Sequence, residues 1–230
     1  VGTSISANSL RIDASGSVGT LERAFTADVD LMSIAASSVH LWSINGTTVG
    51  TVAVTLDRLL SDLSTETVED VALSGVVTTG GGLIDIRTIG GDLNLSATAG
   101  VITAGAAGNV LLTIDGNFDA GAAITSVSGT LTLGISGSGN LDATMSTTGD
   151  ISISSGSDWA MSGASIVAGA LVSIDSGADL TLGNVSGTSV DIDAGAKLLS
   201  ANGSTRNISA TIGASLLARD GIGASRSDYN

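Results

Sequence analysis

Apolar residues alternate with small polar residues in short segments along the chain. The segments "LTL" at 131–133, "ISI" at 151–153, "VSI" at 172–174 and "VDI" at 190–192 carry an apolar side chain at every second position. A period of two carried by aliphatic residues, many of them β-branched, is typical of β-strands, whereas an amphipathic helix repeats about every 3.6 residues. We therefore expect an all-β chain.

The strand segments recur at a nearly constant interval. When the second apolar residue of each pair is taken as an anchor, the successive intervals are 19, 19, 20, 21 and 18 residues. A second apolar pair follows six and eight residues later, as Trp159 and Met161 follow Ile153, and a weaker third segment such as 166–167 comes after it. The anchors are Leu95, Ile114, Leu133, Ile153, Ile174 and Ile192.

Three short strands in the same order in every repeat predict one coil of a parallel β-helix, because hairpins would need alternating strand directions. One coil cannot bury its inward face, but a stack of coils can. The phrases "SIDSGADL" at 173–180 and "DIDAGAKL" at 191–198 are then the same strand, turn and corner one coil apart. Since parallel crossovers are overwhelmingly right-handed, we expect a right-handed solenoid. Its coils hold about 18–21 residues, and roughly ten to eleven of them stack about 4.8 Å apart.

The segment 51–79 interrupts this rhythm and holds the densest charge in the chain. Its leucines at 56–63 are compatible with a short helix, while the flanking "VAV" at 52–54 favours a β-hairpin that projects from the rod. We favour the hairpin, because solenoids tend to carry specific contacts on insertions. A decorated corner without a ligand is the alternative. The charged residues are Asp57, Arg58, Asp62, Glu66, Glu69 and Asp70.

The expected organisation is β-helix coils over 1–50, the insertion over 51–79 and regular coils over 80–220. The "VG" at 18–19 in "ASGSVGTLERAF" matches the "IG" at 222–223 in "ARDGIGASRSDY", 204 residues later. We therefore interpret 221–230 as the start of a second cassette. The chain begins at Val1 rather than at Met, so we expect it to be a segment of a longer protein.

Composition narrows the partners. Aromatic residues make up 2% of the 230 residues, while hydrophobic residues make up 43%, so the core must be built mainly from small aliphatic side chains. The net charge of −14 disfavours nucleic acid and anionic membranes, which carry charge of the same sign. Two uncharged stretches, 93–114 and 120–141, hold too many Gly, Ser, Thr and Asn residues to span a membrane.

No catalytic constellation stands out in the sequence. His40 is the only histidine, and "VHLWSI" at 39–44 gives it no evident partner, so we expect an ordinary strand residue and no enzyme. Trp159 aligns with the second apolar pair and is expected in the core. Alternation assigns no face to Trp42. If Trp42 and His40 point outward, they are candidate contacts for a sugar or a partner protein.

Aspartates are the only candidate metal ligands. The repeat places Asp175 over Asp193 in the next coil, and it places Asp158, Asp179 and Lys197 in one column. Like charges about 5 Å apart repel by under ~1 kcal/mol in water. One interpretation is a Ca²⁺ ion held by Asp158, Asp175, Asp179 and Asp193, because Ca²⁺ takes oxygen ligands. The other is that solvated aspartates accept N–H groups of the turns, with no cofactor.

Several coils resemble those of very large bacterial surface proteins. "NVLLTIDGNFDAGAAITSVSG" at 109–129, "DISISSGSDWAMSGASIVAG" at 150–169 and "ALVSIDSGADLTLGNVSG" at 170–187 are similar to coils of filamentous-haemagglutinin-like adhesins and related β-strand-repeat giants. The run "ALSGVVTTGGGLIDIRTIGGDLNL" at 72–95 resembles phrases from the middle of their cassettes. The resemblance implies an extracellular or cell-surface right-handed β-helix with structural or adhesive work.

The expected function is therefore a rigid rod or stalk segment of a large bacterial surface protein. Its partners would be further coils of the same chain or end-to-end copies of itself. The alternative is an adhesive module that binds a glycan or protein through the insertion or Trp42. The candidate contact residues are His40, Trp42, Asp57, Arg58, Asp62 and Glu66.

Overall fold

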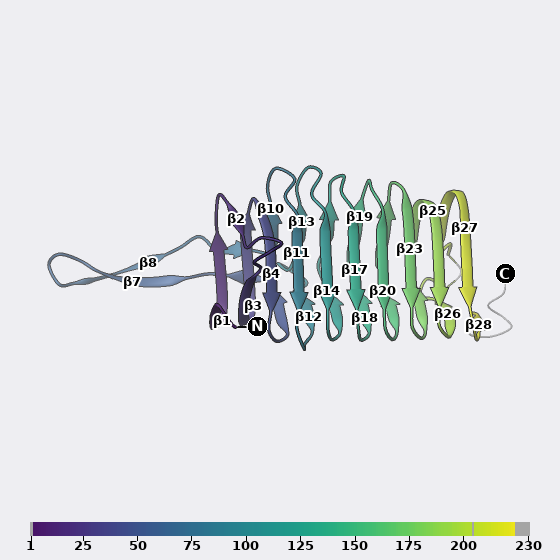
Figure 1. Cartoon of the computed structure of the whole chain (residues 1–230), viewed down its shortest axis with the longest axis horizontal. Helices are drawn as coiled ribbons and strands as arrows, with labels where there is room; N and C mark the ends of the chain where they lie inside the picture. The colour runs from purple at the N-terminus through teal and green to yellow at the C-terminus, as the bar shows by residue number, and fades with distance from the viewer. Residues whose placement is uncertain (1, 204, 224–230) are drawn as a thin grey trace.

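The computed structural model describes residues 2–203 and 205–223. These residues contain β-strands and no helix. Twenty-four of the strands form one sheet in which every pairing between coils is parallel. The sheet winds into a solenoid of about ten turns, drawn as a horizontal rod in Figure 1. The prediction of an all-β parallel β-helix is thus confirmed, while its right-handed sense stays a prediction.

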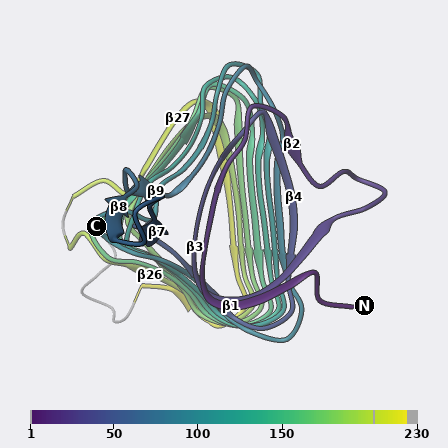
Figure 2. The same cartoon turned by 90° about the vertical axis from the view of Figure 1, so that its left-hand side faces the viewer.

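Seen along the rod, the coils superpose into a rounded triangle with three sheet faces (Figure 2). The strands of the first face stack from one coil to the next with direct pairing. This face contains β2 (Ser17–Val18), β4 (Ser38–Ser43), β11 (Ile84–Thr88), β14 (Val110–Ile114), β17 (Leu131–Ile135), β20 (Ile151–Ser155), β23 (Leu171–Ser176) and the C-terminal parts of β25 (Asn184–Ala194) and β27 (Ile208–Ala218).

The other two faces are built in the same way from shorter strands. The second face contains β5 (Thr47–Val49), β12 (Leu93–Leu95), β15 (Phe118–Ala120), β18 (Gly139–Leu141), β21 (Trp159–Met161), β24 (Leu180–Leu182), β26 (Lys197–Ser200) and β28 (Gly221–Ile222). The third face contains β10 (Val76–Thr78), β13 (Ile102–Ala104), β16 (Ile124–Ser126), β19 (Thr144–Thr147), β22 (Ser165–Ala168) and the N-terminal parts of β25 and β27. The long strands β1 (Ile5–Asp13) and β3 (Phe25–Ala36) bend across more than one face.

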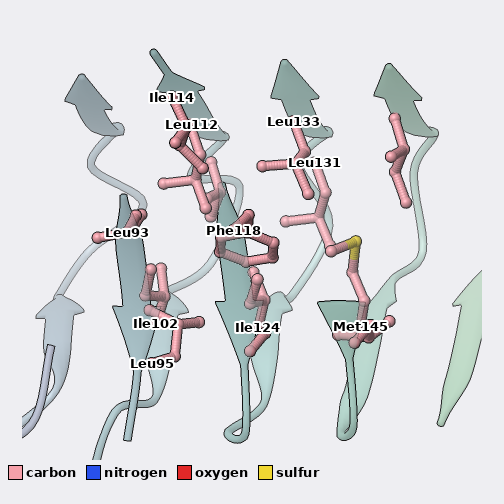
Figure 3. Packing of buried hydrophobic residues seen from close by; sticks show 14 of the residues in the cluster. Leu93, Leu95, Ile102, Leu112, Ile114, Phe118, Ile124, Leu131, Leu133 and Met145 are labelled. Atoms are coloured by element: carbon pink, nitrogen blue, oxygen red, sulfur yellow. The ribbon is translucent and has the colours of Figure 1, made fainter. Parts of the chain in front are cut away.

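Continuous columns of aliphatic side chains fill the interior. Figure 3 shows such inward side chains, among them Leu131, Met145 and Phe118, lying against one another between the faces. Along the third face one column runs through nine coils, and its seven central members are at most 1% exposed. This packing explains the alternation in the sequence, because each strand buries every second residue. The column contains Ile12, Ile34, Val76, Ile102, Ile124, Met145, Ile166, Val185 and Ile208.

Two of the predicted anchors are wrong. Leu95 lies in the second face, and Ile114 pairs with Ile135, one inward position further along than expected. The residues equivalent to Leu133 are Leu112 and Ile86. The cause is that "VLLTI" at 110–114 offers three inward apolar residues, so spacing alone does not choose among them. From Leu112 to Ile192 the coils hold 21, 20, 21 and 18 residues, within the predicted range.

The insertion is a β-hairpin, as predicted, and the helix alternative is wrong. Strands β7 (Thr55–Leu59) and β8 (Thr65–Glu69) pair antiparallel, and β6 (Thr51–Val52) pairs with β9 (Leu73–Ser74) at the base. The hairpin ends earlier than the predicted 79, because β10 already belongs to the third face. It projects along the long axis and extends past β1 (Figure 1).

Both ends of the rod present strand edges. Strand β27 pairs with β25 on one side only, and most of its residues are exposed. Leu216 continues the inward column of Ile192, yet its side chain is 41% exposed because no coil covers it. The proposed cassette match takes two positions in the coil, since Val18 lies in the first face and Ile222 in the second. Residues 224–230 of that proposed cassette lie outside the described residues.

Candidate functional site

The first candidate site lies on the outer surface of the first face. In β4 the side chains of Val39, Leu41 and Ser43 point inward, so His40 and Trp42 point outward. The next strand, β11, places Asp85 beside His40 and Arg87 beside Trp42. The structure thus answers the question that the sequence left open, and it adds two charged residues that sequence reasoning missed.

Two contacts tie this cluster together. His40 Nδ1 lies 3.6 Å from Asp85 Oδ2, and the guanidinium of Arg87 lies 5.9 Å from the centre of the Trp42 ring. The second arrangement is a cation–π contact, worth about 0.5–1 kcal/mol at an exposed site. An indole, a guanidinium and a carboxylate side by side can bind a polar ring such as a sugar by stacking and hydrogen bonding. The cluster therefore has the chemistry of the adhesive alternative.

His40 is covered even though it points outward. Its side chain is 9% exposed. The strand above it is interrupted, because Val18 pairs with Val39 and Phe25 pairs with Leu41, while residues 19–24 leave the sheet between them. Its Nδ1 atom is buried without a hydrogen-bond partner among the described residues. His40 is an ordinary strand residue in its backbone pairing, as expected, with an unusual environment for its ring.

The predicted contact residues of the hairpin mainly bind one another. Arg58 pairs with Glu66 across the two strands, and Asp57 accepts a hydrogen bond of 2.8 Å from the Thr67 hydroxyl. Asp62 accepts bonds from the Ser64 hydroxyl at 2.6 Å and from the Ser64 N–H at 3.0 Å. These two bonds, the hydroxyl first, hold the pKa of Asp62 below its ordinary value. The polar groups thus shape the hairpin and its tip.

The hairpin is joined to the rod at its base. The Arg11 guanidinium of β1 lies 2.8 Å from a carboxylate oxygen of Asp70, which directly follows β8. The side chain of Arg11 is 15% exposed, so this ion pair is partly shielded from water. The N–H of Gly75 also donates a hydrogen bond of 2.9 Å to the carbonyl of Gly50. The two ends of the insertion are therefore adjacent.

The aspartate column at the corner between the first and second faces is a hydrogen-bond ladder. Asp158 accepts the backbone N–H of Asp179 at 3.0 Å, and Asp179 accepts that of Lys197 at 3.0 Å. Asn117 and Asp92 occupy the same position in earlier coils, and Asp92 accepts the N–H of Asn117 at 2.7 Å. For Asp158 and Asp179 the structure thus supports the interpretation of aspartates that bind turn N–H groups.

The second aspartate pair has no such donors. Asp175 and Asp193 are direct partners in neighbouring strands, as the repeat predicts. One carboxylate oxygen of Asp193 is buried without a hydrogen-bond partner among the described residues. In that part of the chain, no three His, Cys, Asp or Glu side chains gather as a metal site. Two carboxylates supply only part of the six to eight oxygen ligands that Ca²⁺ takes.

A shallow groove lies on the outside of the third face near the C-terminal end of the rod. Its volume is about 220 Å³, and we call it the third-face groove. It crosses β22, β25 and β27, so it spans three successive coils. The lining residues are Ser165, Ile166, Val167, Asn184, Val185, Ser186, Arg206, Asn207, Ile208 and Ser209.

No part of the described chain forms a helix that is long and apolar enough to cross a membrane. Comparison of the sequence with models of protein families and with curated proteins finds no match, and comparison with solved structures finds none either. The functional argument therefore rests on the geometry of this molecule.

Proposed function

We propose that the chain is a structural rod or stalk segment of a large extracellular bacterial surface protein of the adhesin type. The observation that carries this proposal is the set of uninterrupted inward columns, such as the nine-residue column of the third face. Each coil contributes backbone hydrogen bonds and apolar contacts to its neighbours only, so length grows by adding coils at a constant cross-section. A stiff rod of this kind needs no disulfide, and the chain has no cysteine.

The exposed edges support a rod that continues. Strand edges that carry unpaired N–H and C=O groups tend to pair with further strands. The exposed inward residue Leu216 at one end and the exposed β1 at the other fit coverage by additional coils. These coils would come from the same polypeptide or from a second copy. The resemblance of the coils at 109–187 to filamentous-haemagglutinin-like proteins agrees with this role and with the cell surface as the location.

Electron microscopy and small-angle X-ray scattering of the 230-residue chain test the proposal. We expect particles of one narrow diameter, whose maximum dimension at low concentration matches a single rod with its hairpin. A particle with a compact, nearly spherical envelope would contradict a rod. Filaments that grow with concentration would show that the ends join, whereas single rods at all concentrations would favour a covalent stalk.

The adhesive module is a second candidate because Trp42 and Arg87 present an indole and a guanidinium on the outside of the rod. A glycan array with the fluorescently labelled chain tests this function. Binding that disappears in Trp42→Ala and persists in Trp159→Phe would support a carbohydrate site, since Trp159 is buried. Binding that is equal in wild type and Trp42→Ala would exclude this surface as the site.

A further inference from the structure

The hairpin reaches beyond the end of the rod. Its strands β7 and β8 are exposed on both surfaces, including Leu56, Leu59 and Val68. The Arg11–Asp70 ion pair fixes its base against β1, and from there it extends along the long axis past β1 (Figure 1). An isolated two-stranded hairpin is marginally stable in water. Its exposed apolar side chains therefore call for a surface beyond β1.

The hairpin is long enough to lie along several further coils. A strand rises by about 3.3 Å per residue, so the nine residues 51–59 span about 30 Å, or roughly six coils at about 4.8 Å each. The hairpin leaves the rod between the coils of Ile34 and Val76, about two coils from the end. Roughly four coils of reach remain beyond β1.

A second copy of this chain fits the space beyond β1. The third-face column begins with Ile12 at one end and finishes with Ile208 at the other, and both ends have the same cross-section. Stacking β27 of one copy on β1 of the next would continue the column without a change in register. This contact is head-to-tail, so it repeats into an open fibre rather than closing into a ring.

In such a stack the hairpin would meet the third-face groove of the neighbour. The hairpin is inserted at the corner between the second and third faces, because it connects β5 to β10. The groove begins at the same corner, where β26 leads to β27, and both lie on the same side of the rod in Figure 2. The groove spans the three coils nearest the C-terminal end, within the reach of the hairpin. It presents Val167, which is 42% exposed, for apolar contact.

The charges of the two surfaces are complementary. The hairpin carries Arg58 and five acidic residues, whereas the chain has no basic residue between Arg87 and Lys197. Arg206 is exposed at the rim of the third-face groove. An acidic hairpin placed over this corner gains an opposite charge that the middle of the rod does not offer. The acidic residues are Asp57, Asp62, Glu66, Glu69 and Asp70.

We propose that the hairpin is an axial clasp that seats on the third-face groove of a second copy stacked against β1. The clasp rests on the proposed rod function and gives it a mechanism of assembly. The stacked strand edges supply the backbone pairing, and the clasp sets the rotational position of one copy on the next. The groove binds this chain itself, through Val167 and Arg206.

Engineered cysteines test the clasp, since the chain has none of its own. Leu56→Cys and Leu59→Cys sample the two surfaces of the hairpin, and each is combined in one chain with Val167→Cys. We expect a ladder of disulfide-linked oligomers under mild oxidation from at least one pair. The matched control replaces Val167 with Val127, which is 54% exposed outside the groove. Ladders no stronger than those of the Val127→Cys control would overturn the proposal.

Excision of the hairpin gives an independent test. Residues 51–74 are removed and Gly50 is joined to Gly75, whose backbones are already hydrogen bonded. Sedimentation should show at least tenfold weaker association for this variant and for Arg206→Glu, with Lys197→Glu as the charge control. Unchanged association of the excised variant would reject the clasp. A wild type that stays monomeric would also reject it, while the scattering dimension of the excised rod tests the rod function separately.

Discussion

The indole ring of Trp159 lies over Gly139 and occupies the space that a side chain at Gly139 would fill. A Cβ atom added to Gly139 would come 2.2 Å from the ring carbon Cε3. Gly139 separates Trp159 from Phe118 in the column of the second face, and the two rings stack with centres 6.4 Å apart and planes 7° apart. In this column, one residue without a side chain lets the two rings pack together within a thin core.

Gly139→Ala should therefore destabilise the rod. Overpacking a filled core costs about 1–3 kcal/mol, and the Cβ atom has no free space beside the indole. Trp159→Ala should cost more, about 3–5 kcal/mol, because it leaves a cavity. Urea unfolding followed by circular dichroism measures both. Gly213→Ala is the matched control, since a Cβ atom there meets nothing within 4 Å.

A second substitution separates the clash from a backbone effect. Replacing Trp159 with Leu in the Gly139→Ala background removes the clashing ring atoms, so part of the lost stability should return relative to the sum of the single changes. A Gly139→Ala variant as stable as Gly213→Ala would contradict the packing account.

The sequence predicts the strands better than it predicts their alignment. Alternation marks almost every inward residue after Leu131, because the corners there are short and of nearly equal length. It fails at Leu95 and Ile114, where the coil from Ile86 to Leu112 holds 26 residues. The length of a corner is tolerated without any periodic signal, so spacing carries no information about it.

The same limit applies to the candidate sites. His40 and Trp42 are visible as unusual residues in an aliphatic strand. Their partners Asp85 and Arg87 come after the hairpin, and only the three-dimensional register brings them together. The groove is also invisible in the sequence, because it forms between outward residues of three different coils.

Asp179 should stabilise the stack through its hydrogen bond to the Lys197 N–H. Asp179→Ala should lower the free energy of unfolding by about 1–2 kcal/mol, since a hydrogen bond to a charged group is lost. Asp179→Asn should retain most of it, because the amide oxygen can accept the same N–H, as Asn117 does for Ser138. Thermal unfolding of the two variants checks this. Equal losses for Ala and Asn would show that the negative charge matters rather than the acceptor. Asp191→Ala, at an exposed position of β25, is the control.

Asp193 should be slightly destabilising in the absence of a cation. It pairs directly with Asp175, and two like charges at this separation repel by under ~1 kcal/mol in water. Asp193→Asn is therefore expected to raise the melting temperature by a small amount, equally with calcium and with chelator. A wild type that calcium stabilises, with the effect lost in Asp175→Asn and Asp193→Asn, would instead establish the calcium interpretation.

The tip of the hairpin should lose order at acidic pH. Hydrogen bonds from the Ser64 hydroxyl and N–H lower the pKa of Asp62 from its ordinary 3.8 in the folded turn. The folded turn thus binds its proton less tightly than the open chain does, so the carboxylate supports the turn above pH 3.8 and this support is lost as the pH falls through the lowered pKa. NMR titration of the Asp62 carboxyl carbon and the Ser64 amide should give one common midpoint below 3.8. Ser64→Ala should move the Asp62 midpoint upward, because the larger of the two causes is removed. A midpoint unchanged by Ser64→Ala would show that the hydroxyl does not stabilise the charged carboxylate.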